Sequence, residues 1–339
     1  MRRAAMLGTL LVTASVFAAG CSSGAGSAGT GAPDAAGGGA AVQGGSASDV
    51  SSNTYVFLPK SLNNPYWVDA REGMKAEATK LDVQAQFLGP ATDDAAKQVA
   101  IFESVLAKKP AGIAVSPNDP GSVTQIVAMA RAANIPVIAW DGPVPNSQVL
   151  GYIGTDNVAA GEKAAEALGT AMGGKGKLAV VIGSLSATNL NQRLEGLKQG
   201  LAKFPGISIV ATEQSGESIG DAQAKAETIL QAHPDLTGFA GIGGSDLPGI
   251  AGALKSGGQC GKIKAVGFDV VPQGVDGMKG GCVDALISQK PFGMTEQALQ
   301  ILVDFHSGKS TMPPNFNVDT GVEVVTPATL DAFQAAAPH

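Results

Sequence analysis

The sequence contains few of the residues on which many enzymes and nucleic-acid-binding proteins depend. Histidine occurs only at positions 233, 306 and 339, and there is no Cys/His cluster with metal-ligand spacing, no EF-hand loop and no Gly-x-Ser-x-Gly elbow. Charged residues make up 15% of the chain, the formal net charge is −6, and no basic patch is visible, which argues against nucleic acid as a partner. We therefore expect a protein that is not an enzyme and that carries neither a metal nor a cofactor.

Long apolar runs are also scarce. The 339 residues are 44% hydrophobic, enough for a sizeable core in two domains or one large one. The apolar stretch over residues 7–17 is too short to span a bilayer. It follows Arg2 and Arg3 and precedes small residues at 18–20, a pattern that predicts a secretory signal peptide over residues 1–20.

The residue after this leader is a cysteine. Small residues followed by Cys21 resemble a bacterial lipobox, in which the cysteine is lipidated and becomes the new N-terminus, although Ala18 stands where leucine is usual. The alternative is ordinary cleavage that leaves a free thiol. Residues 22–53 are mostly glycine, alanine and serine, a composition that cannot bury enough surface to fold. We expect them to form a flexible tether behind the anchor.

The chain has only two other cysteines. In an oxidising compartment an even pair indicates a disulfide. Cys260 and Cys282 each lie just before a predicted strand, and two neighbouring parallel strands would bring these starts together. We therefore expect a Cys260–Cys282 bridge; the alternative is two separate buried thiols.

From residue 54 onward, short apolar runs alternate with segments of helical periodicity. Such alternation is typical of βαβ units with parallel sheets covered by helices on both faces. About ten strands over some 280 residues indicate an α/β protein with two Rossmann-like lobes. Strands are expected near 55–58, 83–88, 111–115, 136–140, 178–182, 207–212, 238–242, 263–268 and 283–288, and helices near 67–81, 95–106, 123–133, 158–172, 190–204, 221–232, 248–255 and 294–305.

Ligands of open α/β sheets bind beyond the carboxyl ends of the strands. Nearly every predicted strand here is followed by a side chain able to hydrogen-bond a hydroxyl, and several strand ends carry an aromatic. Carboxylates, amides and lysine pair with hydroxyls, while aromatic faces pack on the apolar side of a sugar. This mixture predicts a site for a sugar or polyol.

Structural roles compete with this interpretation. Asp141, Asp269 and the pair at 245–246 are also favoured helix N-caps, and the asparagines at 189 and 191 can cap as well. Trp67 fits core packing on the first helix. Lys60 in a loop is by default a solvated charge.

Several segments together resemble one known family. Residues 60–67, 138–141, 153–157, 232–235 and 266–269 are similar to the ribose-type, type I periplasmic solute-binding proteins of ABC importers. The similarity covers about residues 54–326. Carried over by position, the ligand contacts of that family fall on eleven residues: Lys60, Asn64, Tyr66, Trp67, Asp141, Asn189, Asn191, Asp246, Phe268, Asp269 and Gln289.

The resemblance also implies a division of the chain. It places an N-terminal lobe over residues 54–155 plus 290–320 and a C-terminal lobe over residues 156–289 plus 321–335, joined by a three-segment hinge near 155–156, 289–290 and 318–321. Closure about such a hinge would enclose the ligand.

Departures from the pattern argue against ribose itself. Gly142 and Asn191 stand where ribose binders have arginine, and neither the family's arginine near Gly220 nor its aromatic near Ser218 is present. Lys60 instead resembles the rhamnose- and autoinducer-2-binding branch. The ligand is left open among deoxysugars, linear polyols and furanoses.

The resemblance implies a monomeric substrate-binding lipoprotein on the outer face of the cell membrane. Its partners would be a small sugar or polyol and an ABC permease, with membrane contact through the lipid alone. The alternatives are a subunit that presents bound ligand to a membrane receptor and a secreted sugar hydrolase. A sugar-responsive transcription regulator of this fold is disfavoured, because the signal peptide occupies the place of its DNA-binding helices.

Overall fold

A computed structural model describes residues 44–336 of the chain. The predicted signal peptide, Cys21 and tether residues 22–43 lie outside this range. Within it, no helix combines the length and apolarity needed to cross a bilayer. Residues 44–53, predicted as tether, instead pack on the first lobe: Val50 is buried and the amide of Gly45 donates to the carbonyl of Phe87. Val50 is the one large apolar side chain next to the domain there, and its burial extends the folded region.

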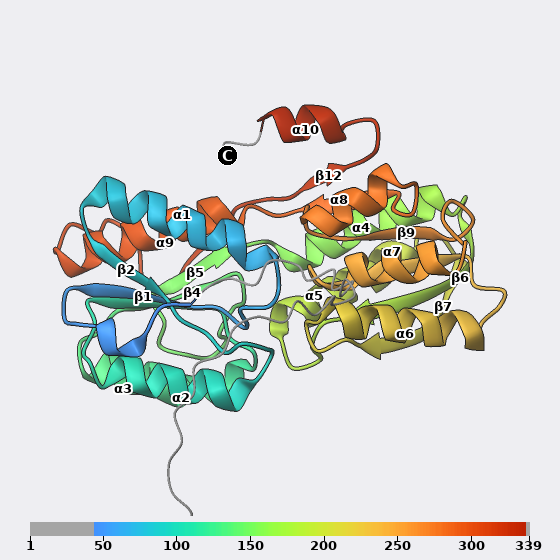
Figure 1. The fold of residues 1–339 in the computed structure, drawn as a ribbon. Coiled ribbons are helices and arrows are strands. Elements are labelled where there is room, and N and C mark those ends of the chain that lie inside the picture. Colours follow the sequence, from blue (N-terminus) through green and yellow to red (C-terminus); the bar gives the residue numbers. More distant parts are fainter. Residues whose placement is uncertain (1–43, 337–339) are drawn as a thin grey trace, which may run out of the picture. The chain divides into compact units, whose positions relative to one another are not determined.

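The first lobe is built on a six-stranded sheet in the order β11-β5-β4-β3-β1-β2, in which every pairing is parallel. Helices α1 and α9 cover one face, and α2 and α3 cover the other (Figure 1). The elements are β1 (Thr54–Leu58), α1 (Tyr66–Leu81), β2 (Gln84–Phe87), α2 (Ala95–Leu106), β3 (Gly112–Val115), α3 (Pro120–Ala132), β4 (Val137–Trp140), β5 (Gly151–Gly154), α9 (Pro291–His306) and β11 (Phe316–Asp319), with a short 3-10 turn at Ala47–Asp49.

The alternation of side chains along β1 shows how this sheet is buried on both faces. Tyr55 and Phe57 pack under α1 and α9, whereas Val56 and Leu58 pack under α2 and α3. All four are at most 4% exposed. A strand covered on both faces reads as a continuous apolar run rather than an alternating one, which is why this strand was recognisable in the sequence.

The second lobe repeats the arrangement with the sheet order β12-β10-β9-β8-β6-β7. Helices α4 and α5 cover one face, and α6, α7 and α8 cover the other. Its elements are α4 (Asn157–Ala171), β6 (Lys175–Ile182), α5 (Thr188–Leu201), β7 (Gly206–Gln214), α6 (Ile219–Ala232), β8 (Gly238–Gly241), α7 (Asp246–Ser256), β9 (Lys264–Phe268), α8 (Pro272–Lys279), β10 (Ala285–Ser288), β12 (Glu323–Val325) and α10 (Leu330–Ala336).

The structure agrees with the predicted α/β class of two lobes and departs from it in one strand pairing. Strand β12 runs antiparallel to β10, so the second sheet is mixed at that edge. The chain passes between the two sheets three times, after β5, after β10 and after β11. Two of the crossings are tied together at Asp319, whose Oδ1 accepts the backbone N–H groups of Asp156 at 3.0 Å and Gly321 at 2.8 Å.

The predicted disulfide is present. Strands β9 and β10 are parallel neighbours, and Cys260 and Cys282, 22 residues apart, are bonded at the amino ends of these strands. Phe239 and Leu286 belong to the same hydrophobic cluster as Cys282. Because both cysteines precede their strands, the bridge links the amino ends of β9 and β10, opposite to the carboxyl ends of the strands.

We expect the double substitution Cys260→Ser with Cys282→Ser to lower the free energy of unfolding by about 3 kcal/mol, because a bridge across a loop of this length restricts the unfolded chain. Urea unfolding with circular dichroism measures this loss. Wild-type protein treated with dithiothreitol should lose the same amount. An unchanged midpoint in both samples would contradict a stabilising role for the bridge.

Candidate functional site

Side chains from the carboxyl ends of strands in both sheets converge on one pocket. The cavity has a volume of about 10 Å³, roughly the space of one water molecule. Each sheet contributes through the loops that follow its strands and the first two turns of the next helices, so the two lobes share the lining. The lining residues are Lys60, Asn64, Tyr66, Trp67, Asp141, Asn189, Leu190, Arg193, Glu217, Gly243, Gly244, Asp269 and Gln289.

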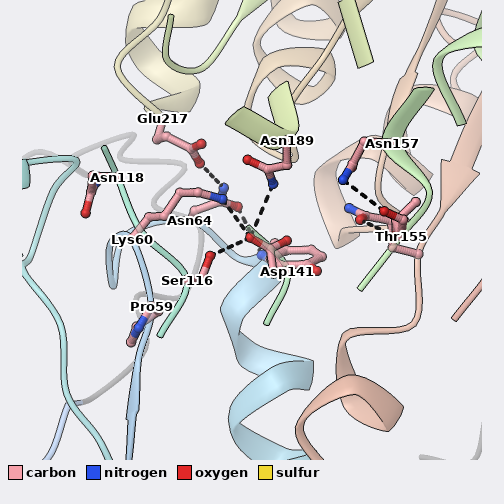
Figure 2. Close-up of polar contacts among 12 residues, drawn as sticks. Pro59, Lys60, Asn64, Ser116, Asn118, Asp141, Thr155, Asn157, Asn189 and Glu217 are labelled. Atoms are coloured by element: carbon pink, nitrogen blue, oxygen red, sulfur yellow. Dashed lines mark hydrogen bonds and ion pairs between the residues drawn. The ribbon is translucent and has the colours of Figure 1, made fainter. Parts of the chain in front are cut away.

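A buried ion pair lies at the centre of the first lobe's contribution (Figure 2). Lys60 Nζ lies 2.6 Å from Asp141 Oδ2, and both side chains are 3% exposed. The same oxygen accepts hydrogen bonds from Ser116 Oγ at 2.6 Å and from Asn189 Nδ2 at 3.3 Å. Burial raises the pKa of Asp141, but the charges of Lys60 and Arg193 outweigh it and hold that pKa below its usual value. Asp141 is therefore an ionised acceptor.

Arg193 has an equivalent central place in the second lobe. Its guanidinium donates to Asn157 Oδ1 at 2.9 Å, to the carbonyl of Ile242 at 3.2 Å and to Gln289 Oε1 at 2.6 Å. The group also lies 4.4 Å from the centre of the Phe268 ring, a cation–π contact. Three acceptors and one ring fix the guanidinium in a single position.

Close approach of two helices places Arg193 beside Asn157. A Cβ on Gly161 of α4 would lie 2.1 Å from the carbonyl oxygen of Arg193 on α5, and one on Gly196 would lie 2.0 Å from that of Val158. Glycine at both positions lets the two backbones touch. This contact sets the distance that the Arg193–Asn157 hydrogen bond spans.

Gln289 and Asp269 complete the second lobe's part of the site. Gln289 Nε2 donates to Asp269 Oδ1 at 2.8 Å, while Gln289 Oε1 accepts from Thr155 Oγ1 at 2.8 Å as well as from Arg193. Burial raises the pKa of Asp269 to about 7; Arg193 and Gln289 oppose that shift. Asp269 therefore changes protonation near neutral pH.

Two hydrogen bonds across the pocket join the lobes directly, the one from Asn189 to Asp141 and one from Asn64 to Glu217. Asn64 Nδ2 donates to Glu217 Oε2 at 2.7 Å, and Asn64 Oδ1 accepts the backbone N–H of Tyr66 at 3.1 Å. Figure 2 shows Asn64 and Glu217 facing each other from the two lobes. Burial is the largest cause that raises the pKa of Glu217.

Three acidic residues of the pocket have backbones in the left-handed region. Asp141 has φ 56°, Glu217 has φ 58° and Asp269 has φ 71°. Residues other than glycine adopt such angles uncommonly, and the cost is of the order of 1–3 kcal/mol each. Strain of this kind gathers at functional sites, and here it falls on the carboxylates that face the cavity.

Aromatic rings form the apolar wall of the pocket. Tyr66 and Trp67 line it, and Trp67 packs edge-on against Trp140 with ring centres 5.4 Å apart. The indole nitrogen of Trp67 and Oδ1 of Asn189 are buried without a protein partner. Buried polar atoms are nearly always hydrogen-bonded, so these two are available to a ligand.

The structure does not bring three of the expected contact residues to the lining. Asn191 donates to the carbonyls of Leu185 and Ala187, at the start of α5. Asp246 lies behind the wall, where its carboxylate accepts from the Ser215 hydroxyl and from the backbone of Gly243. Phe268 supports Arg193 from the core.

The other eight expected residues line the pocket together. Trp67 is therefore more than a core residue, and Lys60 is not a solvated charge. Sequence reasoning missed Arg193 and Glu217. Arg193 follows Asn189 by one helical turn and so shares its face of α5, a usable signal. Glu217 follows an edge strand after a glycine, and nothing in the sequence distinguishes it from a surface charge.

Among the described residues there is no grouping of His, Cys, Asp and Glu that could hold a metal.

Asp246 provides a test of buried acidity. Burial raises its pKa from 3.8 to about 7, with Glu217 adding to the shift and Ser215 opposing it. The folded state then retains a proton that the unfolded chain releases, so this group stabilises the fold at low pH and loses that effect as pH rises from about 4 to 7.

We expect the free energy of unfolding of Asp246→Asn to increase relative to that of wild type as pH rises across that window, by up to about 1.4 kcal/mol per pH unit. Urea unfolding at pH 4.5, 6 and 8 measures the difference. Asp235→Asn serves as a control, because Asp235 is exposed beside Lys177 and its pKa is lowered. A difference from wild type that does not vary with pH would show that Asp246 does not retain the proton.

Known proteins match nearly the whole domain. The model of the periplasmic binding protein domain matches residues 55–310. The D-allose-binding periplasmic protein of Escherichia coli is 26% identical over 79% of this chain and 89% of its own length. The ribose import binding protein of the same organism is 27% identical over 73% of this chain and 82% of its own length.

A solved structure agrees with these relatives. The solute-binding protein of an ABC transporter from Burkholderia graminis, in complex with D-arabinose, is 34% identical, covers 83% of this chain and 98% of its own, and superimposes with a TM-score of 0.78. The relatives are sugar-binding transport proteins, not enzymes. With the fold, the pocket and these matches in agreement, the chain belongs to the type I periplasmic binding proteins that bind sugars.

Proposed function

We propose that this protein is the extracytoplasmic substrate-binding lipoprotein of an ABC importer, which captures a sugar or polyol between its lobes and delivers it to the permease. One observation carries the proposal. Hydrogen-bonding side chains at the strand ends of both sheets line a single pocket beside two aromatic rings. Charged and amide groups satisfy hydroxyls, and the rings pack on the apolar face of a sugar.

The relatives support the ligand class. The sugars in their names, or bound in their structures, are D-allose, ribose and D-arabinose, which are all polyhydroxylated and uncharged. The pocket departs from the ribose pattern at Gly142, where a Cβ would lie 3.6 Å from Cε of Lys60. Lys60 thus brings its charge, from a different strand end, close to the position where ribose binders have arginine.

Binding requires that the lobes move apart and close again. The cavity of about 10 Å³ is far smaller than a sugar, and its polar groups pair with one another across it. The three chain crossings between the sheets, two of them tied at Asp319, are the natural hinge. On entry, ligand hydroxyls would replace these internal partners, and the closed form would be the one that docks on the permease.

The anchor belongs to the same proposal. Lipidation at Cys21, followed by a tether that ends before Val50, would hold the domain near the outer face of the membrane. Metabolic labelling with a radioactive fatty acid tests this, with Cys21→Ser as the unlabelled control. Labelling that persists in the Cys21→Ser variant would contradict the assignment.

We expect a panel of pentoses, hexoses and linear polyols to contain at least one compound that raises the melting temperature of the purified protein. Asp141→Asn should weaken binding of that compound at least 100-fold in calorimetry, because it removes the charge that orders Lys60, Ser116 and Asn189. Asn189→Ala, which leaves the ion pair intact, should weaken binding at least 10-fold.

Asp235→Asn is the matched control, since it removes an exposed carboxylate from an ion pair with Lys177. It should bind as wild type does. Unchanged affinity in both pocket variants, or a panel without any binder, would overturn the proposed function.

A further inference from the structure

Glu217 is a buried carboxylate that faces the pocket without a cationic partner. The residue is 3% exposed, and its carboxylate accepts a hydrogen bond from the neutral amide of Asn64. No ion pair in the described part of the chain includes it. A buried charge normally has a compensating partner, and the effective cost of leaving one without is several kcal/mol. A protein that keeps a carboxylate there has a use for it.

The local structure is arranged around this carboxylate. A Cβ on Gly183 would lie 2.9 Å from Glu217 Oε1, so glycine at the end of β6 makes room for that oxygen. The backbone of Glu217 itself has φ 58°, an angle that glutamate rarely adopts. Burial and backbone strain each oppose a glutamate here, and Gly183 leaves room for it, so packing alone does not account for it.

The cations of the lining are already engaged. Lys60 is paired with Asp141 at 2.6 Å, and the Arg193 guanidinium is held by Asn157, Ile242 and Gln289. The charge of Lys60 is compensated by Asp141, whereas Arg193 is fixed by neutral acceptors. Against these two cations the lining has three carboxylates, with two more behind it at Asp93 and Asp246.

Neighbouring charges act on Glu217 in both directions. Lys60 favours its ionised form, whereas Asp93 and Asp141 disfavour it, and burial is the strongest influence. A donor supplied by the ligand would add to the single amide that Glu217 now accepts from. A second carboxylate brought to the same place would meet the charge of Glu217 or compete for its proton.

We propose that Glu217 is a specificity-determining residue: it accepts a hydrogen bond from a hydroxyl or ammonium group of the ligand and excludes sugar acids. The inference rests on the proposed function, since it concerns the ligand of the same pocket. It differs from the ribose-type pattern, in which an aromatic is expected near Ser218. Here the corresponding end of the pocket has a carboxylate, which accepts a hydrogen bond from a polar group of the ligand, whereas an aromatic would pack on the apolar face of the ligand.

Calorimetry with matched carbon skeletons tests the assignment. Each neutral sugar and polyol of the panel is compared with its aldonate: xylose and xylitol with xylonate, arabinose and arabinitol with arabinonate, ribose and ribitol with ribonate, and glucose and sorbitol with gluconate. For any neutral binder, we expect the wild type to bind the matched aldonate at least 100-fold more weakly. Where sorbitol binds, 1-amino-1-deoxysorbitol should bind at least as tightly.

Glu217→Gln keeps the size of the side chain and its acceptor for Asn64 but removes the charge. It should reduce the preference for the neutral ligand over the matched aldonate at least tenfold, measured as the ratio of their dissociation constants. The change should come mainly from tighter binding of the aldonate. Glu213→Gln, which removes an exposed carboxylate paired with Lys225 near the same strand end, should leave the ratio unchanged.

A ratio of dissociation constants separates specificity from a merely structural role, because loss of packing would weaken both ligands alike. Tight aldonate binding by the wild type, or an unchanged ratio in Glu217→Gln, would overturn the inference while leaving sugar capture intact. Absence of any binder, neutral or acidic, would instead count against the proposed function.

Discussion

Compensation of buried charge is the constraint on which the pocket depends. Lys60, Asp141, Arg193, Glu217 and Asp269 are all buried, and each must find partners inside the protein. Lys60 and Asp141 pair directly, and removing one member of such a pair costs about 3–5 kcal/mol. Arg193 is instead surrounded by neutral acceptors and a ring. Contacts within each lobe therefore hold Lys60, Asp141 and Arg193 in place before a ligand arrives, which reduces the ordering cost of binding.

The two lobes supply equivalent parts of this arrangement. Their sheets have the same strand order, and β4 occupies the position in the first that β9 occupies in the second. Each of these strands ends in a buried aromatic followed by an aspartate with positive φ, Trp140-Asp141 in one and Phe268-Asp269 in the other. The aspartate N–H then donates to the next strand in both lobes, to Ile153 and Ile287. The same aromatic–aspartate arrangement at a strand end, present in both lobes, gives the cavity a carboxylate from each side.

The contrast between those two aspartates comes from their neighbours. Lys60 and Arg193 lower the pKa of Asp141, whereas burial raises that of Asp269 to about 7. The first lobe thus presents a fixed charge, and the second presents a group that can donate or accept near neutral pH. Hydroxyls, which do both, are suited to such a pair.

Much of the fold was predictable because its strands are buried on both faces and read as apolar runs. The short strands β5, β11 and β12 and helices α8 and α10 were not predicted, since they are three to eight residues long and their identity depends on neighbours distant in sequence. The disulfide followed from the order of β9 and β10.

At the site, the sequence identified residues directly after strands, such as Asp141 and Gln289. It missed residues whose role arises from tertiary contact. The hydrogen bond from Arg193 to Asn157, for example, depends on the close approach of two helices that Gly161 and Gly196 permit. Asn191, two positions earlier, faces its own helix end instead.

The central claim is that one ligand is held simultaneously by strand-end side chains of both lobes. A crystal structure of the complex with the tightest binder of the panel tests it most directly. The account predicts ligand hydroxyls within hydrogen-bonding distance of Asp141 from the first sheet and of Arg193 or Asp269 from the second. A ligand bound to one lobe alone, or outside this pocket, would contradict it.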